Sequence, residues 1–172
     1  MEHRRANMHT SFGSITRNYL GGDTRNHHWR YRPLKVEINQ VTTVDYDEVI
    51  PISEAGDDPR ARPVLEEWIR HSPLVWEGRI NGRVACVFGL IPKSIFDDEA
   101  YIWLLTTTVA QEHPFVFLRH SQIMMQRLFR LYNVIYGHVL PSNKSGIKWL
   151  KWLGMKPRGQ THGMIEFEIR SA

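Results

Sequence analysis

Residues 74–91 constrain the fold of this chain more than any other segment. Two apolar runs, Leu74–Ile80 and Arg83–Ile91, are separated only by Asn81-Gly82. Asn and Gly tolerate the positive φ angles of a two-residue turn, so this pair between apolar runs is the strongest short-range hairpin signal. Just upstream, Leu34–Val41 alternates apolar and polar residues, which is typical of a half-buried strand. The chain is therefore expected to build on antiparallel strands.

The pattern after the hairpin alternates between strand and helix. Three further strands are predicted, the first of them central because it is apolar almost throughout: Tyr101–Thr108, Val134–Leu140 and Met164–Ile169. Four helices are predicted, the first capped by Asp45 and the last closed by Gly154: 46–50, Pro63–His71, Pro114–Tyr132 and Ser142–Leu153. The sequence thus predicts a single α/β domain, with helices packed on a mixed sheet.

Residues 1–33 differ from the rest of the chain. They contain six Arg against Glu2 and Asp23, which gives +4, and the whole chain also carries +4. This segment has no sustained period of 2 or 3.6, and Gly21-Gly22 interrupts it. We therefore predict a basic, His-rich arm over residues 1–33 and a globular domain over residues 34–172.

The arm contains a candidate binding segment. It places two aromatic rings among cations and imidazoles, at Arg25, His27, His28, Trp29, Arg30, Tyr31 and Arg32. Trp, Tyr and Arg are favoured anchors in protein interfaces, and the same mixture suits base stacking and phosphate contact. We favour protein docking, with DNA contact as the second interpretation. The four His of the arm lack the spacing of a metal site, so no metal is predicted.

Composition excludes several classes of protein. With 42% hydrophobic residues the chain has enough apolar side chains for a core. It has no run of about 18 apolar residues, so no membrane-spanning helix is expected, and no secretory signal is recognisable. Its one cysteine, Cys86, lies in an apolar run and is predicted to be a core residue rather than a nucleophile. A single cysteine fits synthesis in a reducing cytoplasm.

The hairpin, the central strand, the long helix and the segment Asn143–Lys156 together resemble the GCN5-related N-acetyltransferase (GNAT) superfamily. In that family an Asn begins a helix that ends at a Gly, and here Asn143 and Gly154 are eleven residues apart. The resemblance covers residues 34–170. It implies a mixed, mostly antiparallel sheet flanked by helices.

Two positions depart from the chemistry of that family. The family loop between central strand and long helix reads Gln/Arg-x-x-Gly-x-Gly/Ala, whose glycines let backbone amides approach the pyrophosphate of acetyl-CoA. Here residues 109–121 contain no glycine, and Pro114 removes one amide donor. The family's general acid, a Tyr seven residues after the Asn, corresponds to Leu150. We therefore predict no catalytic residues and no bound cofactor.

A narrower resemblance fits this interpretation. The acetyltransferase-like internal virion proteins of short-tailed phages share the pattern carried here by Trp103, Thr106, Arg119, Asn143, Ile147, Leu150 and Gly154. It implies a phage structural or assembly protein, made in the host cytoplasm and incorporated in the virion. We expect its arm to dock onto other virion components in a symmetric, multi-copy assembly.

Two alternatives remain open. The first is an N-acetyltransferase in which a divergent loop still binds acetyl-CoA; its cofactor-binding residues would be Gln111, Arg119, His120 and Asn143. The second is a nucleic-acid-binding protein that uses the basic arm, with strongly salt-dependent affinity.

Overall fold

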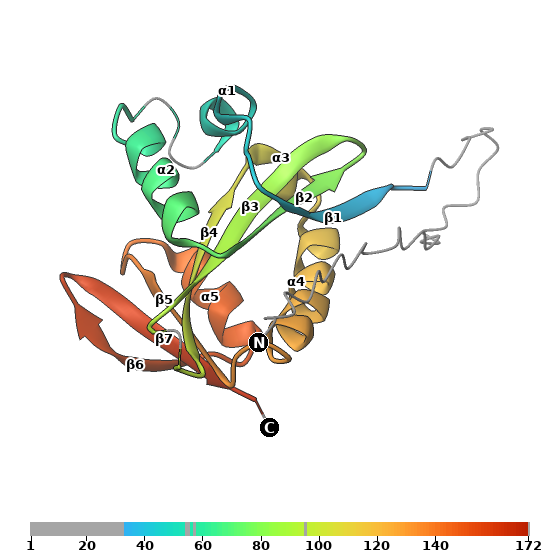
Figure 1. Ribbon diagram of the computed structural model, residues 1–172. Coiled ribbons are helices and arrows are strands. Elements are labelled where there is room, and N and C mark those ends of the chain that lie inside the picture. Colours follow the sequence, from blue (N-terminus) through green and yellow to red (C-terminus); the bar gives the residue numbers. More distant parts are fainter. Residues whose placement is uncertain (1–32, 54–55, 57, 95, 172) are drawn as a thin grey trace, which may run out of the picture.

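The computed structural model describes residues 33–53, 56, 58–94 and 96–171 (Figure 1). Within these ranges seven strands form one sheet in the order β1-β2-β3-β4-β5-β7-β6. Neighbouring strands are antiparallel except β4 and β5, which run parallel. The strands are β1 (Val36–Val41), β2 (Leu74–Ile80), β3 (Arg83–Pro92), β4 (Glu99–Thr106), β5 (Val134–Val139), β6 (Lys156–Thr161) and β7 (Met164–Arg170).

The predicted hairpin is confirmed as the pair β2–β3. Its turn residues have positive φ angles, 52° at Asn81 and 82° at Gly82, as a two-residue turn requires. The Asn81 side chain also accepts a hydrogen bond from the Lys35 backbone amide at 3.0 Å. This bond fixes the chain just before β1, which pairs with β2 along its whole length.

The helices cover both faces of the sheet. Short α1 (Tyr46–Val49) and α2 (Ala61–His71) pack with Trp103 on one face, whereas α4 (Pro114–Leu128) and α5 (Lys144–Trp152) pack on the other. The Asp45 side chain caps α1 by accepting from the amides of Asp47 and Glu48, as predicted. A 3₁₀ turn, η1 (Ile50–Ile52), follows α1, and α3 (Thr108–Glu112) joins β4 to α4.

The strand residues alternate between these two layers. On β4, Ala100 belongs to the cluster packed by α4, and Trp103 to the cluster packed by α2. Cys86 is buried in the α4 cluster, as predicted, and burial raises the pKa of its thiol to about 12. The thiol therefore stays protonated at neutral pH, which fits a core residue.

Several element boundaries differ from the sequence predictions. Helix α2 begins at Ala61, two residues before Pro63, and α4 ends at Leu128 rather than Tyr132. Leu131, within the predicted helix 114–132, lies beyond α4 and is 47% exposed. Strand β6 and helix α3 were not predicted at all. Gly154 does follow α5, with φ of 91°, as expected for a glycine that ends a helix.

The described residues test the expectations about membrane-spanning helices and metal sites, but they do not include residues 1–32 of the arm. None of the described helices is long and apolar enough to cross a membrane. Within the described ranges no three His, Cys, Asp or Glu side chains form a group suited to a metal ion. The segment Arg25–Arg32 and the four His of the arm lie outside the described residues.

Candidate ligand-binding cleft

A cleft opens where β4 and β5 separate. The two strands pair over only three positions, Glu99–Tyr101 with Val134–Tyr136. Beyond Tyr101, β4 continues to Thr106 while β5 ends at Val139. Gly137 marks the point of separation, since a Cβ there would lie 3.0 Å from the Ile102 carbonyl oxygen. The diverging strand edges thus border a cleft at the centre of the sheet.

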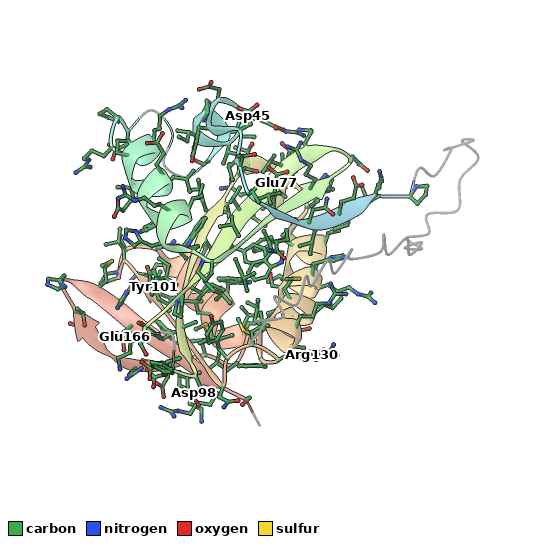
Figure 2. The ribbon with its side chains drawn as sticks, in the orientation of Figure 1. Asp45, Glu77, Asp98, Tyr101, Arg130 and Glu166 are labelled. Atoms are coloured by element: carbon green, nitrogen blue, oxygen red, sulfur yellow. The ribbon has the colours of Figure 1, made fainter. Side chains whose placement is uncertain are left out.

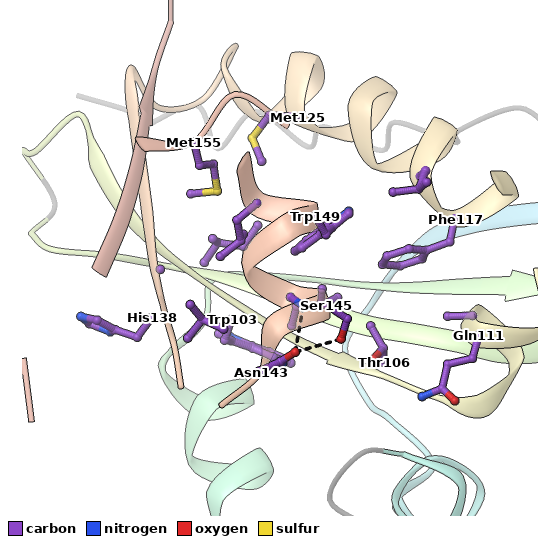
Figure 3. Close-up of a pocket in the computed structure, with 18 of the residues that line it drawn as sticks. Trp103, Thr106, Gln111, Phe117, Met125, His138, Asn143, Ser145, Trp149 and Met155 are labelled. Atoms are coloured by element: carbon purple, nitrogen blue, oxygen red, sulfur yellow. Dashed lines mark hydrogen bonds between the residues drawn. The ribbon is translucent and has the colours of Figure 1, made fainter. Parts of the chain in front are cut away.

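The cleft has a volume of about 570 Å³ and a largely apolar lining (Figure 3). Helix α5 crosses it, with Met155 and Met125 at one end and Gln111 at the other. Trp149 of α5 contacts Phe117 of α4, with ring centroids 5.7 Å apart. The polar lining residues are Tyr101, Thr106, Gln111, His138, Asn143 and Ser145. This combination of an apolar wall and a few polar groups is typical of a site for a small molecule or an extended chain.

The N-terminus of α5 is closed by its own cap. The Asn143 Oδ1 accepts from the Gly146 amide at 2.8 Å and from the Ser145 hydroxyl at 3.1 Å. Gly146 permits this contact, because a Cβ there would lie within 2.9 Å of the Asn143 side chain. Asn143 therefore lines the cleft as a helix cap.

The junction between β4 and α4 is a short helix rather than an open loop. The hydroxyl of buried Thr107 donates to the Val84 carbonyl at 2.7 Å and accepts from the amide of Val109 in the first turn of α3. At the other end of α3, Arg83 binds Glu112 through two hydrogen bonds, of 2.7 and 3.2 Å. This pairing lowers the pKa of Glu112, whose carboxylate is stabilised by the guanidinium.

This junction does not fit the pyrophosphate of acetyl-CoA. Pro114, the first residue of α4, has no amide proton, and the Phe117 amide already donates to the His113 carbonyl. The first turn keeps only the amides of Phe115 and Val116, and a carboxylate, Glu112, lies just before it. The apolar cleft itself is compatible with the uncharged arm of the cofactor. The residues of this junction therefore do not fit the phosphate groups of acetyl-CoA.

The proton-bearing groups of the cleft lie away from Leu150. Leu150 lines the cleft and is buried, so no acid stands at this position. Tyr101 and His138, from β4 and β5, line the same cleft with ring centroids 5.3 Å apart. His138 Nε2 lies 3.1 Å from Glu166 Oε2. Burial, and secondarily Tyr136, raises the pKa of the Tyr101 hydroxyl, which stays protonated at neutral pH.

The four residues assigned to the acetyltransferase alternative do not form one site. Gln111 and Asn143 line the cleft. His120 lines a separate cavity of about 70 Å³ between the sheet and α4, with its Nδ1 2.9 Å from the Val116 carbonyl oxygen. Arg119 lines neither of these two cavities. The sequence analysis did not single out Tyr101 or His138 for this cleft. Each lies in a predicted strand, and this position alone does not indicate that the two side chains meet.

Comparison with known proteins identifies the fold. No protein-family model and no curated protein matches the sequence. Solved structures do match, among them a Bacillus subtilis acetyltransferase in complex with CoA, with a TM-score of 0.63 and 8% identity over 80% of this chain and 100% of that one. A GNAT family acetyltransferase from Elizabethkingia anophelis with acetyl-CoA bound has a TM-score of 0.60 and 11% identity, covering 79% and 98% of the two chains.

A third structure, an IAA acetyltransferase from Bacillus cereus, has a TM-score of 0.58 and 12% identity, covering 79% of this chain and 99% of that one. At such low identities the likeness concerns the backbone arrangement and leaves the chemistry open. The resemblance inferred from Asn143, Gly154 and the strand order is confirmed at this level. This chain has the fold of the GNAT acetyltransferases.

Proposed function

We propose that this chain is a non-catalytic, virion-associated phage protein that uses an acetyltransferase-like fold as a scaffold. The observation that carries the proposal is the junction after β4, where α3 is held by Thr107 and by the Arg83–Glu112 pair. A phosphate group at this junction would lack the amide of Pro114 and the close backbone approach that glycines allow, and the Arg83 guanidinium is already paired with Glu112. The leucine at position 150 supports the same conclusion, because it has no proton to give.

The phage assignment rests on the sequence pattern of Trp103, Arg119, Asn143 and Gly154 described above. In this proposal the globular domain is a stable platform and the basic arm docks onto other virion components. The protein is made in the host cytoplasm and functions in the virion as repeated copies.

An acetyl-CoA-dependent N-acetyltransferase is the second candidate, and the cleft favours it. A volume of about 570 Å³ between β4 and β5 can hold a ligand, and Tyr101 and the His138–Glu166 pair bring titratable groups to it. In this case the cofactor would depend on the apolar walls of the cleft rather than on phosphate contacts.

Calorimetric titration with acetyl-CoA separates the two candidates. We expect no heat of binding at high micromolar ligand, because the junction offers two free first-turn amides and no glycine. A one-to-one isotherm contradicts this expectation. In that event Gly137→Ala, checked for folding by circular dichroism, serves as a control for the location, since its Cβ would press on Ile102 where the two strands separate. Loss of the heat in this variant assigns binding to the cleft.

Deletion of residues 1–33 tests the docking role. We expect the remaining domain to stay folded and soluble but no longer to associate with virion components, because the candidate anchors Trp29 and Tyr31 are removed. Deletion of residues 1–20 is the matched control, as it keeps Arg25–Arg32 and should keep association. Co-sedimentation with purified particles measures both. Unchanged association after the longer deletion contradicts the docking role.

A further inference from the structure

One part of the sheet has a polar face built from strands alone. Tyr101 borders the region packed by α2, and most described partners of the other side chains come from neighbouring strands, while α5 packs on the opposite side of β5 and β7. We call this surface the acidic strand face; it comprises Glu99, Tyr101, Tyr136, His138, Arg158, Glu166 and Glu168. Figure 2 shows Tyr101 and Glu166 close together on this part of the molecule, away from the start of β1.

The acidic strand face already binds one guanidinium. Arg158 of β6 lies over the Tyr136 ring, 5.8 Å from its centroid. The same guanidinium lies 3.2 Å from Glu166, 3.3 Å from Glu168 and 3.8 Å from Glu99. Three carboxylates and a tyrosine ring are thus arranged around one arginine, in the two geometries that arginine favours.

Negative charge remains after this pairing. Lys93 and Arg170 lie at the rim, 3.8 Å from Glu99 and 3.1 Å from Glu168, and the turn before β4 adds two aspartates. Five carboxylates against four cations leave −1, counting Lys93, Asp97, Asp98, Glu99, Lys156, Arg158, Glu166, Glu168 and Arg170. Burial raises the pKa of Tyr136, and the Glu166 carboxylate raises it further, because both disfavour the negatively charged phenolate.

The chain contains one segment of matching chemistry. Residues 25–32 carry Arg25, Arg30 and Arg32 and no acidic residue, with Trp29 and Tyr31 between them. Its charge of +3 is opposite in sign to the −1 of the acidic strand face, and its rings suit contact with the half-buried tyrosines and the cleft at Tyr101.

The topology keeps the aromatic anchors of this segment, Trp29 and Tyr31, from the face of their own chain. From β1 to β7 there are five strand spacings, about 24 Å. Along the strands, Val36 is level with Arg83, because both pair with Ile80. Tyr101 pairs with Ile91, eight residues past Arg83, so the offset along the strands is about 26 Å. The diagonal is about 35 Å to Glu168, which is level with Tyr101, and about 30 Å to Tyr101 itself, whereas Trp29, seven residues before Val36, reaches about 24 Å when fully extended.

We propose that residues 25–32 of one copy bind the acidic strand face of a second copy. The inference rests on the proposed docking role of the arm, and it names the partner. Because the arm starts at one edge of the sheet and its target lies toward the other, the contact is head-to-tail. Repetition of such a contact from copy to copy builds a ring or an open filament, whereas reciprocal exchange of arms between two copies closes a dimer.

Charge reversal in the full-length chain tests this proposal by sedimentation velocity at modest salt. The first variant is Arg30→Glu/Arg32→Glu, and the second is Glu168→Lys. We expect the wild type to associate and each variant to weaken association about tenfold or more. An equimolar mixture should form a one-to-one dimer, because the first variant keeps its face and the second keeps its arm. A contact between arm and face of different copies gives this result, whereas a contact between like surfaces does not.

Two further variants make the test specific. Glu37→Lys is the matched control, since Glu37 is also a half-buried strand glutamate in an ion pair, but on distant β1; it should associate like the wild type. Glu168→Gln replaces the lysine variant if that variant fails to fold. A monomeric wild type, undiminished association of a folded Glu168 variant, or a mixture that stays monomeric overturns the proposal. If arm deletion abolishes particle association while the Glu168 variants do not affect it, the docking role stands and this partner is wrong.

Discussion

Replacing Trp103 with alanine is expected to lower the free energy of unfolding by about 3–5 kcal/mol. Trp103 is 2% exposed, stacks on Trp68 of α2 at 5.6 Å between centroids, and donates from Nε1 to the Ser72 hydroxyl at 2.7 Å. Its ring also fills the space above Gly89, where even a Cβ would lie 2.7 Å away. Truncation therefore leaves a cavity beneath α2 and removes one of the two hydrogen bonds of the Ser72 hydroxyl, which still donates to the Trp68 carbonyl.

Urea denaturation, followed by circular dichroism, measures this effect. The urea concentration at the midpoint of unfolding should fall, while the dependence of the free energy of unfolding on urea stays the same. Trp152→Ala is the matched control, because Trp152 is 47% exposed on α5 and its loss should cost less than about 1 kcal/mol. Equal destabilisation by the two substitutions would show that the assigned packing of Trp103 is wrong.

Replacing Thr107 with valine has the second largest expected effect, a loss of about 2–3 kcal/mol. The two side chains have nearly the same shape, so the change isolates the hydroxyl. Thr107 is fully buried; its hydroxyl donates to the Val84 carbonyl and accepts from the Val109 amide. Valine leaves both groups without this partner in the core and removes the cap of α3, which positions Gln111 at the cleft.

Thr107→Ser and Thr108→Val are the controls for this experiment. Serine keeps the hydroxyl and should recover most of the loss, whereas exposed Thr108 should tolerate valine with little change. Thermal and urea unfolding of the three variants give the comparison. A Thr107→Val protein as stable as the serine variant contradicts the role of this hydroxyl.

The elements with strong local signals were predictable. Asn81-Gly82 lies between two apolar runs, and both residues have the positive φ angles that a two-residue turn requires. Asn143 and Gly154 likewise bound α5, one as a side-chain cap and the other through its positive φ. In each case the residue's own conformational preference is sufficient, and no distant contact is needed.

The missed elements lack such a signal. Strand β6 reads Lys-Pro-Arg-Gly-Gln-Thr and is exposed along its whole length, so it has no apolar period; it forms because β7 offers an edge to pair with. Helix α3 begins in a run of β-branched threonines that favours a strand. There the buried bonds of Thr107 to the end of β3 override the local preference.

The sequence by itself determined the hairpin, the capped last helix, the glycine-free segment 109–121 and the leucine at position 150, because these depend on which residue stands at one place. Only the tertiary structure decided that β4 and β5 separate after three pairs, and that Tyr101, His138 and Glu166 meet beside the resulting cleft. These residues are distant in sequence. Strand pairing brings them together, and the periodicity of a single segment carries no information about its partner strand.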